Sequence, residues 1–170
     1  KRVLQTAIVI FVLGSARCGV AQDMGQLIAF RAIQGLGGGG LMVTTIAVIG
    51  DIVAPRERGR YQGYTSSALA LATFAGPLLG GFFVDNLTWR WIFYVNVPLS
   101  VVAFLVIQAV LRLPFTPRQH TIDYTGSFLL MTAISSVVLV TSWAGPERGW
   151  RDPMALLLYA LAGLGTAAFL

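Results

Sequence analysis

One arginine stands where a charged side chain is costly. Arg31 lies inside the apolar run Leu27–Gly50, and Gln34 and Gly35 follow it at i+3 and i+4, so the three share one face of a helix. A guanidinium exposed to lipid costs from about 3 kcal/mol to much more, so this face must meet protein or water. From these residues alone, a functional role and a structural role, with neighbouring carbonyls satisfying the arginine, are equally open.

Small residues gather in two of the apolar runs. Gly35, Gly37 and Gly39 in the run Leu27–Gly50 predict close helix packing, which in lipid replaces the hydrophobic drive between helices. Further along, Gly76, Pro77, Gly80 and Gly81 form a Gly-Pro-x-x-Gly-Gly pattern, preceded at intervals of four by Ala68 and Ala72. The proline frees a backbone carbonyl and predicts a bend. A packing groove explains a lone small-residue stripe, but the full pattern is more specific and indicates function.

A basic segment follows Asp51. Ala54–Arg60 carries three arginines and one glutamate, and its simplest role is to set membrane topology. Asp51 ends the preceding apolar run and can pair with Arg58, with Arg60 or with a partner outside this fragment. Such a pair predicts a latch between the cytoplasmic ends of two helices.

Other kinds of chemistry have no signature here. No His, Cys and carboxylate cluster has metal-ligand spacing, and no nucleophile stands near a base. P-loop and GxGxxG motifs are absent, and Cys18 is the only cysteine. The sequence therefore predicts no catalytic residue, no metal site and no cofactor, and it disfavours an enzyme.

The elements that must position these residues follow from composition. Of 170 residues, 56% are apolar and 11% charged, with a mean hydropathy of +0.74, whereas soluble domains have about 25% charged residues. A bilayer core needs about 20 apolar residues per helix. The chain contains six such runs, and none alternates with the period of two that a membrane barrel requires. We expect an all-α integral membrane protein, a polytopic helical bundle with these spans: Val3–Ala21, Leu27–Gly50, Tyr61–Val84, Trp91–Leu111, Tyr124–Trp143 and Pro153–Leu170.

Charge sets the orientation. The net charge of +5 lies in short loops between apolar runs, which argues against nucleic-acid binding and for topology control. The richer set of loop ends is predicted to be cytoplasmic, with both ends of the chain: Lys1, Arg2, Arg56, Arg58, Arg60, Arg112 and Arg118. The opposite set holds Arg90, Arg148 and Arg151. The first run also resembles a secretory signal peptide, but polar Gln5 and Thr6 favour a true span, and both chain ends suggest an internal fragment of a longer protein.

At this point the chain resembles the major facilitator superfamily, and within it the fourteen-span drug:proton antiporters of the EmrB/QacA type (DHA2). Arg31–Gly37 looks like the fourth-helix motif of the family, and Gly63 followed by Ala72 and Gly76–Gly81 is similar to its fifth-helix antiporter motif, with alanine at Ala72 where glycine is usual. Trp89–Pro98 resembles the entry to helix six, and Ile122–Gly126 opens a further span after a short loop.

The resemblance implies a domain organisation. Residues 1–112 would be helices three to six of the N-terminal bundle, 113–123 a cytoplasmic loop, and 124–170 two additional helices between the halves. The rest of the parent chain would line much of the cavity.

The resemblance also implies a function, which is proton-coupled efflux of small amphipathic or cationic compounds by alternating access in the cytoplasmic membrane. Arg31, with Gln34, would couple to protons; Gly63, Ala72, Gly76, Pro77, Gly80 and Gly81 would form the bend and close contact that let the bundle rock. The partners would be lipid, protons and a small-molecule substrate, with the proton gradient as energy source. Export or import of one specific metabolite is the first alternative, and a non-transporting scaffold or sensor is a distant one.

Overall fold

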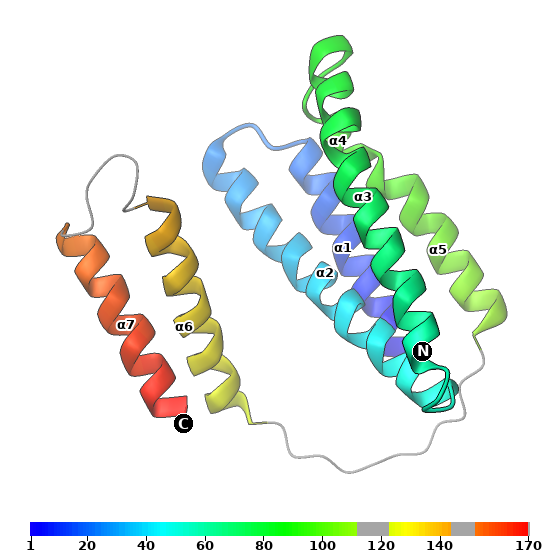
Figure 1. Cartoon of the computed structure of the whole chain (residues 1–170). Helices are drawn as coiled ribbons and strands as arrows, with labels where there is room; N and C mark the ends of the chain where they lie inside the picture. The colour runs from blue at the N-terminus through cyan, green and yellow to red at the C-terminus, as the bar shows by residue number, and fades with distance from the viewer. Residues whose placement is uncertain (112–122, 144–151, 170) are drawn as a thin grey trace. The chain divides into compact units, whose positions relative to one another are not determined.

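The structure is a computed structural model that describes residues 1–111, 123–143 and 152–169. All its regular structure in these residues is α-helical, which confirms the expected all-α fold (Figure 1). The helices are α1 (Arg2–Gly19), α2 (Met24–Ile52), α3 (Arg58–Asn86), α4 (Trp91–Tyr94), α5 (Asn96–Val110), α6 (Tyr124–Trp143) and α7 (Pro153–Phe169).

Five helical stretches of the described chain are long and apolar enough to cross a membrane. They coincide with the first five predicted spans, α4 and α5 together making the fourth. The sixth predicted span is α7, an apolar helix of 17 residues that is slightly shorter than the others. Helices α2 and α3 have 29 residues each, or about 43 Å at 1.5 Å per residue, so each exceeds a bilayer core of about 30 Å.

Only the hydrogen bonding of the fourth span is interrupted, between α4, which ends at Tyr94, and α5, which begins at Asn96. Val95 between them keeps helical torsion angles, φ −59° and ψ −28°, and Trp91–Val110 is a single candidate span, as the hydropathy pattern predicted. Pro98 accounts for the missing hydrogen bond, because it has no N–H for the carbonyl of Tyr94.

The contacts divide the chain into two compact units, Lys1–Phe115 and Thr116–Leu170. In the first unit, α1 is central and packs mainly on α2, with further contacts to α4 and α5. Helix α3 touches α2 and α4 only slightly, and none of its residues is buried. In the second unit, α6 packs along α7, with Ala133, Val140 and Ala155 buried between them. Most of the predicted loop 113–123 lies outside the described residues.

Two sets of polar contacts define the ends of the first unit. At one end, Lys1 Nζ donates to the carbonyl oxygen of Gln108 at 2.8 Å, and Gln5 bonds the Gln108 side chain. At the other end, the guanidinium of Arg90 donates to the carbonyl oxygens of Gly19 and Ala21, at 3.1 and 2.9 Å. The placement of Lys1 and Arg90 at opposite ends of this unit agrees with the predicted topology, in which they lie on opposite sides of the membrane. Which of these sides is cytoplasmic stays a prediction.

Candidate functional site

Arg31 is held on α2 about two turns from the start of that helix. Its Nη1 donates to Oε1 of Gln34 at 3.0 Å, and its Cζ lies 5.5 Å from the centroid of the Phe93 ring. The i,i+3 spacing brings Gln34 beneath the guanidinium, and the aromatic face adds a cation–π attraction that strengthens where water is excluded. The partners of this charge in the described chain are thus an amide oxygen and an aromatic ring, not a carboxylate.

Gln34 connects Arg31 to two other helical segments. Its side chain is only 4% exposed, and its Nε2 donates to Oγ of Ser15 on α1 at 2.9 Å. Ser15 is fully buried and donates to the carbonyl oxygen of Phe93 at 2.9 Å, while Asn96 Nδ2 donates to Ser15 Oγ at 3.2 Å. We call Arg31, Gln34, Ser15, Phe93 and Asn96 the Arg31 cluster. It is a connected polar network, and every buried side-chain N or O in the described residues has a partner.

Two glycines let α1 and α2 approach closely enough for these contacts. A Cβ on Gly14 would lie 2.6 Å from the backbone N of Gln34, and a Cβ on Gly37 would lie 2.7 Å from Cα of Phe11. Such distances leave no room for any side chain. The predicted close packing is therefore present at Gly37, whereas a Cβ on Gly35 or Gly39 would meet no described atom within 4 Å.

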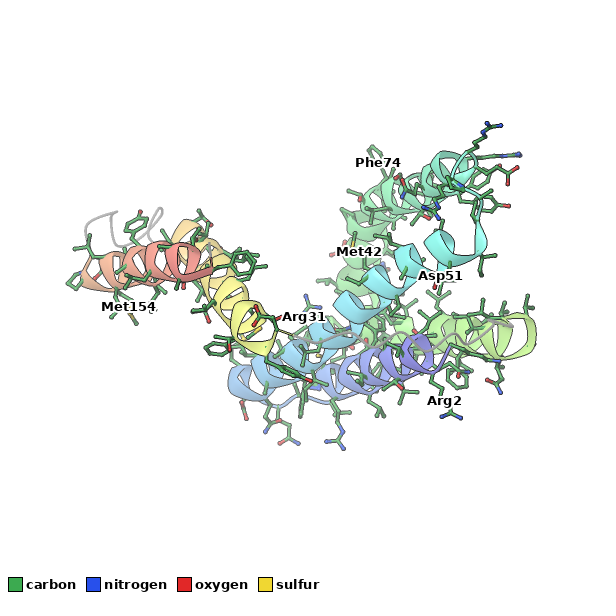
Figure 2. All side chains as sticks on the ribbon, turned by 90° about the horizontal axis from the view of Figure 1, so that it is seen from below. Arg2, Arg31, Met42, Asp51, Phe74 and Met154 are labelled. Carbon is green, nitrogen blue, oxygen red and sulfur yellow. The ribbon has the colours of Figure 1, made fainter. Side chains whose placement is uncertain are left out.

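The face of α3 that carries the Gly-Pro-x-x-Gly-Gly pattern has no partner among the described residues. A Cβ on Gly63, Gly76, Gly80 or Gly81 would meet nothing within 4 Å, and Ala72 and Pro77 are exposed. Phe74, labelled in Figure 2, is 77% exposed on the same helix. The helix runs unbroken through Pro77, and Thr73 bonds the Leu69 carbonyl with its hydroxyl at 2.9 Å.

The predicted latch between Asp51 and the loop arginines is not formed in the described residues. The guanidinium of Arg58 donates instead to the carbonyl oxygens of Gly50 and Val53, at 2.6 and 3.1 Å. Arg60 donates to the Tyr64 hydroxyl at 2.9 Å. The last carbonyls of a helix lack partners and carry negative partial charge. They therefore compete with the carboxylate of Asp51 for the guanidinium of Arg58. Figure 2 shows Arg31 and Asp51 at well-separated points of α2.

Sequence reasoning missed three members of the Arg31 cluster, namely Ser15, Phe93 and Asn96. A weak signal existed for Ser15, because Gly14, Ser15 and Cys18 put small or weakly polar groups on one side of the first span. The carbonyl of Phe93 has no signature in sequence. Arg17 is exposed in the last turn of α1.

Comparison with known proteins shows the family to which this sequence belongs. The profile described as Major Facilitator Superfamily matches residues 1–170. The chain is 38% identical over 167 residues to an MFS-type transporter of Mycobacterium tuberculosis strain H37Rv, covering 97% of this chain and 24% of that protein. It is 38% identical over 169 residues to the MFS-type efflux pump LUC4 of Fusarium sp, covering 96% of this chain and 30% of that protein.

A third relative is the multidrug transporter protein MdtP of Bacillus subtilis strain 168. It is 36% identical over 169 residues, which are 97% of this chain and 30% of that protein. The chain therefore spans between 24% and 30% of the length of these three relatives. All three are named as transporters or efflux pumps, and none is named as an enzyme.

Proposed function

Because the chain belongs to the major facilitator superfamily, we propose that it is part of a proton-coupled exporter, a drug:proton antiporter of the fourteen-span EmrB/QacA type. Its substrates are small amphipathic or cationic compounds, its energy source is the proton gradient, and it needs no cofactor. The name of LUC4, an efflux pump, supports export, and the name of MdtP, a multidrug transporter, supports substrates of more than one kind. The observation that carries the proposal is an arginine inside a membrane span, held by a buried network that joins three helical segments.

Arg31 acts in this proposal by a positive charge held at a fixed position, which needs the planar guanidinium fork that bonds Gln34. A guanidinium does not release its proton in proteins, so it does not carry the transported proton. Its positive charge stabilises the ionised form of a nearby carboxylate or ordered water and so lowers the pH at which that group binds a proton. The described spans offer Arg31 only Gln34 and Phe93, so the proton carrier belongs to another part of the protein.

The exposed face of α3 supplies the moving contact. Glycines with open space around them allow another helix backbone to approach closely. Gly76, Pro77, Gly80 and Gly81 would seal one side of the cavity and let the bundle rock. In the same proposal, residues 1–112 are helices three to six, 113–123 is a cytoplasmic loop and 124–170 is the additional pair. The separation of the contacts into two units supports this division.

The test uses the full-length protein in an efflux-deficient host. Ethidium accumulation is followed with and without a protonophore. We expect low accumulation that rises to the empty-vector level when the protonophore is added. In the Arg31→Lys variant, which keeps the charge but loses the planar fork, accumulation should stay high without protonophore.

Two results would contradict the proposal. Accumulation equal to empty vector, with the protein shown to be in the membrane, would reject multidrug efflux and favour transport of one metabolite. Full protonophore-sensitive efflux by Arg31→Lys would remove Arg31 from coupling. Thr6→Ala is the control, because its exposed hydroxyl bonds only the Arg2 carbonyl within α1 and takes no part in the Arg31 cluster.

A further inference from the structure

Ser15 is the point at which three helical segments meet within the Arg31 cluster. Its Oγ lies 2.9 Å from the Phe93 carbonyl oxygen, 2.9 Å from Gln34 Nε2 and 3.2 Å from Asn96 Nδ2. A serine hydroxyl offers one proton and two lone pairs. All three are used here, in a residue with no exposed surface.

The hydrogen bonds have a forced direction. The Phe93 carbonyl can only accept, so it takes the single proton of Ser15. Ser15 must then accept from Gln34, which turns the NH₂ group of that amide toward α1. The carbonyl oxygen of the same amide consequently faces Arg31, where it accepts from Nη1 at 3.0 Å.

Reversing the amide would present NH₂ to a guanidinium, which has donors only. Neither group would then have an acceptor there, and leaving a buried polar group unpaired costs more than a normal hydrogen bond gains. The orientation of the Gln34 amide thus decides whether Arg31 is held in place.

We propose that Ser15 is a positioning residue for Arg31, acting through the Gln34 amide and anchored to the Phe93 carbonyl beside the junction between α4 and α5. Asn96 supports it by donating to the second lone pair. This inference rests on the proposed function, because it assigns Ser15 the task of holding the coupling arginine. Through the same hydrogen bonds, a movement of the Arg31 guanidinium would disturb the α4–α5 junction, and a movement of that junction would disturb Arg31.

The experiment uses the full-length protein with three variants, Ser15→Ala, Gln34→Met and the double substitution. Methionine has the length of glutamine but neither donates nor accepts strongly. Thr6→Ala is the matched control, because its hydroxyl bonds only the Arg2 carbonyl within α1 and is exposed. Protonophore-sensitive ethidium efflux and the melting temperature in detergent are both measured.

We expect Ser15→Ala and Gln34→Met each to lower the maximal efflux rate by roughly tenfold, with an unchanged half-saturating ethidium concentration, since a buried hydrogen bond to a charged network carries about that factor. The double variant should be no slower than the slower single variant. Because Arg31→Lys alone should abolish efflux, its coupling to Ser15 is read from the melting temperature: Ser15→Ala should lower the melting temperature less in the Arg31→Lys protein than in the wild-type protein. Thr6→Ala should export normally.

An equal fall in melting temperature caused by Ser15→Ala in the wild-type and the Arg31→Lys protein would overturn the proposal, because a serine that does not act on Arg31 would give it. A normal rate in Ser15→Ala would overturn it equally. The melting temperatures separate this result from failure of the proposed function. If the wild-type protein exports nothing, Ser15→Ala and Gln34→Met must still lower the melting temperature by less together than the sum of their separate effects; additive shifts would refute the link between them.

Discussion

The contact between α1 and α2 yields the sharpest prediction, at Gly37. In Gly37→Ala the added Cβ would lie 2.7 Å from Cα of Phe11 and 2.9 Å from the carbonyl oxygen of Ala7. Ordinary carbon contacts lie at about 3.5–4.0 Å, so the two backbones must separate by roughly 1 Å. A gap of that size forfeits a quarter to a half of the dispersion attraction at each affected contact.

The cost follows from that separation. Overpacking of this kind destabilises by about 1–3 kcal/mol, against which alanine regains about 0.5–1 kcal/mol of helix propensity over glycine. The same movement would pull Gln34 from Ser15, now 2.9 Å away. Gly37→Ala should therefore lower both the melting temperature of the full-length protein and its efflux.

Two glycines on the same helix provide the controls. Gly35→Ala and Gly39→Ala make the same chemical change where no described atom lies within 4 Å of the new Cβ. They should retain or slightly raise the melting temperature, because only the helix-propensity gain applies. The assay is thermal unfolding of the purified protein in one detergent. A Gly37→Ala protein as stable as the two controls would refute the reasoning.

Three further predictions concern the other parts of the site. Arg58→Ala should destabilise the protein by about 0.5–1 kcal/mol because it uncaps the end of α2, while Asp51→Asn should leave the melting temperature unchanged; equal effects would restore the ion-pair interpretation. Gly80→Val should abolish efflux yet leave the amount of protein in the membrane unchanged, as measured by immunoblot, since its side chain meets no described neighbour; full efflux would reject the moving contact. Single cysteines at Glu57 and Thr88, both exposed, test the orientation with an impermeant thiol reagent: intact cells should label only Thr88→Cys, and the opposite pattern would invert the topology.

Local physics explains what could be predicted about the fold. The number and limits of the spans depend on the length of apolar runs, which is a property of the chain itself. The helix that begins at Tyr124 also follows a local rule, because the carboxylate of Asp123 accepts from the backbone N–H of Gly126 at 2.8 Å. The missing hydrogen bond at Val95 could have been predicted from Pro98, which has no N–H to donate.

The candidate site was predictable only in part. Arg31 and Gln34 could be paired from sequence because they lie three residues apart on one helix. Ser15 and Asn96 lie on other helices, α1 and α5, and the partner at Phe93 is a backbone carbonyl, which every residue has. The carbonyl partners of Arg58 could not be predicted, because every residue has a backbone carbonyl and only the fold shows which of them lie near this guanidinium.

The sequence by itself determined that this chain crosses a membrane as helices, where those helices lie, and which arginine needs a partner. The tertiary structure alone decided which faces meet: that Gly37 and not Gly35 touches α1, and that Ser15 orients the Gln34 amide. The physical reason is that in lipid the outer and inner faces of a helix are both apolar. Hydropathy therefore sets the length of each helix but not its rotation, and rotation decides which side chains can reach one another.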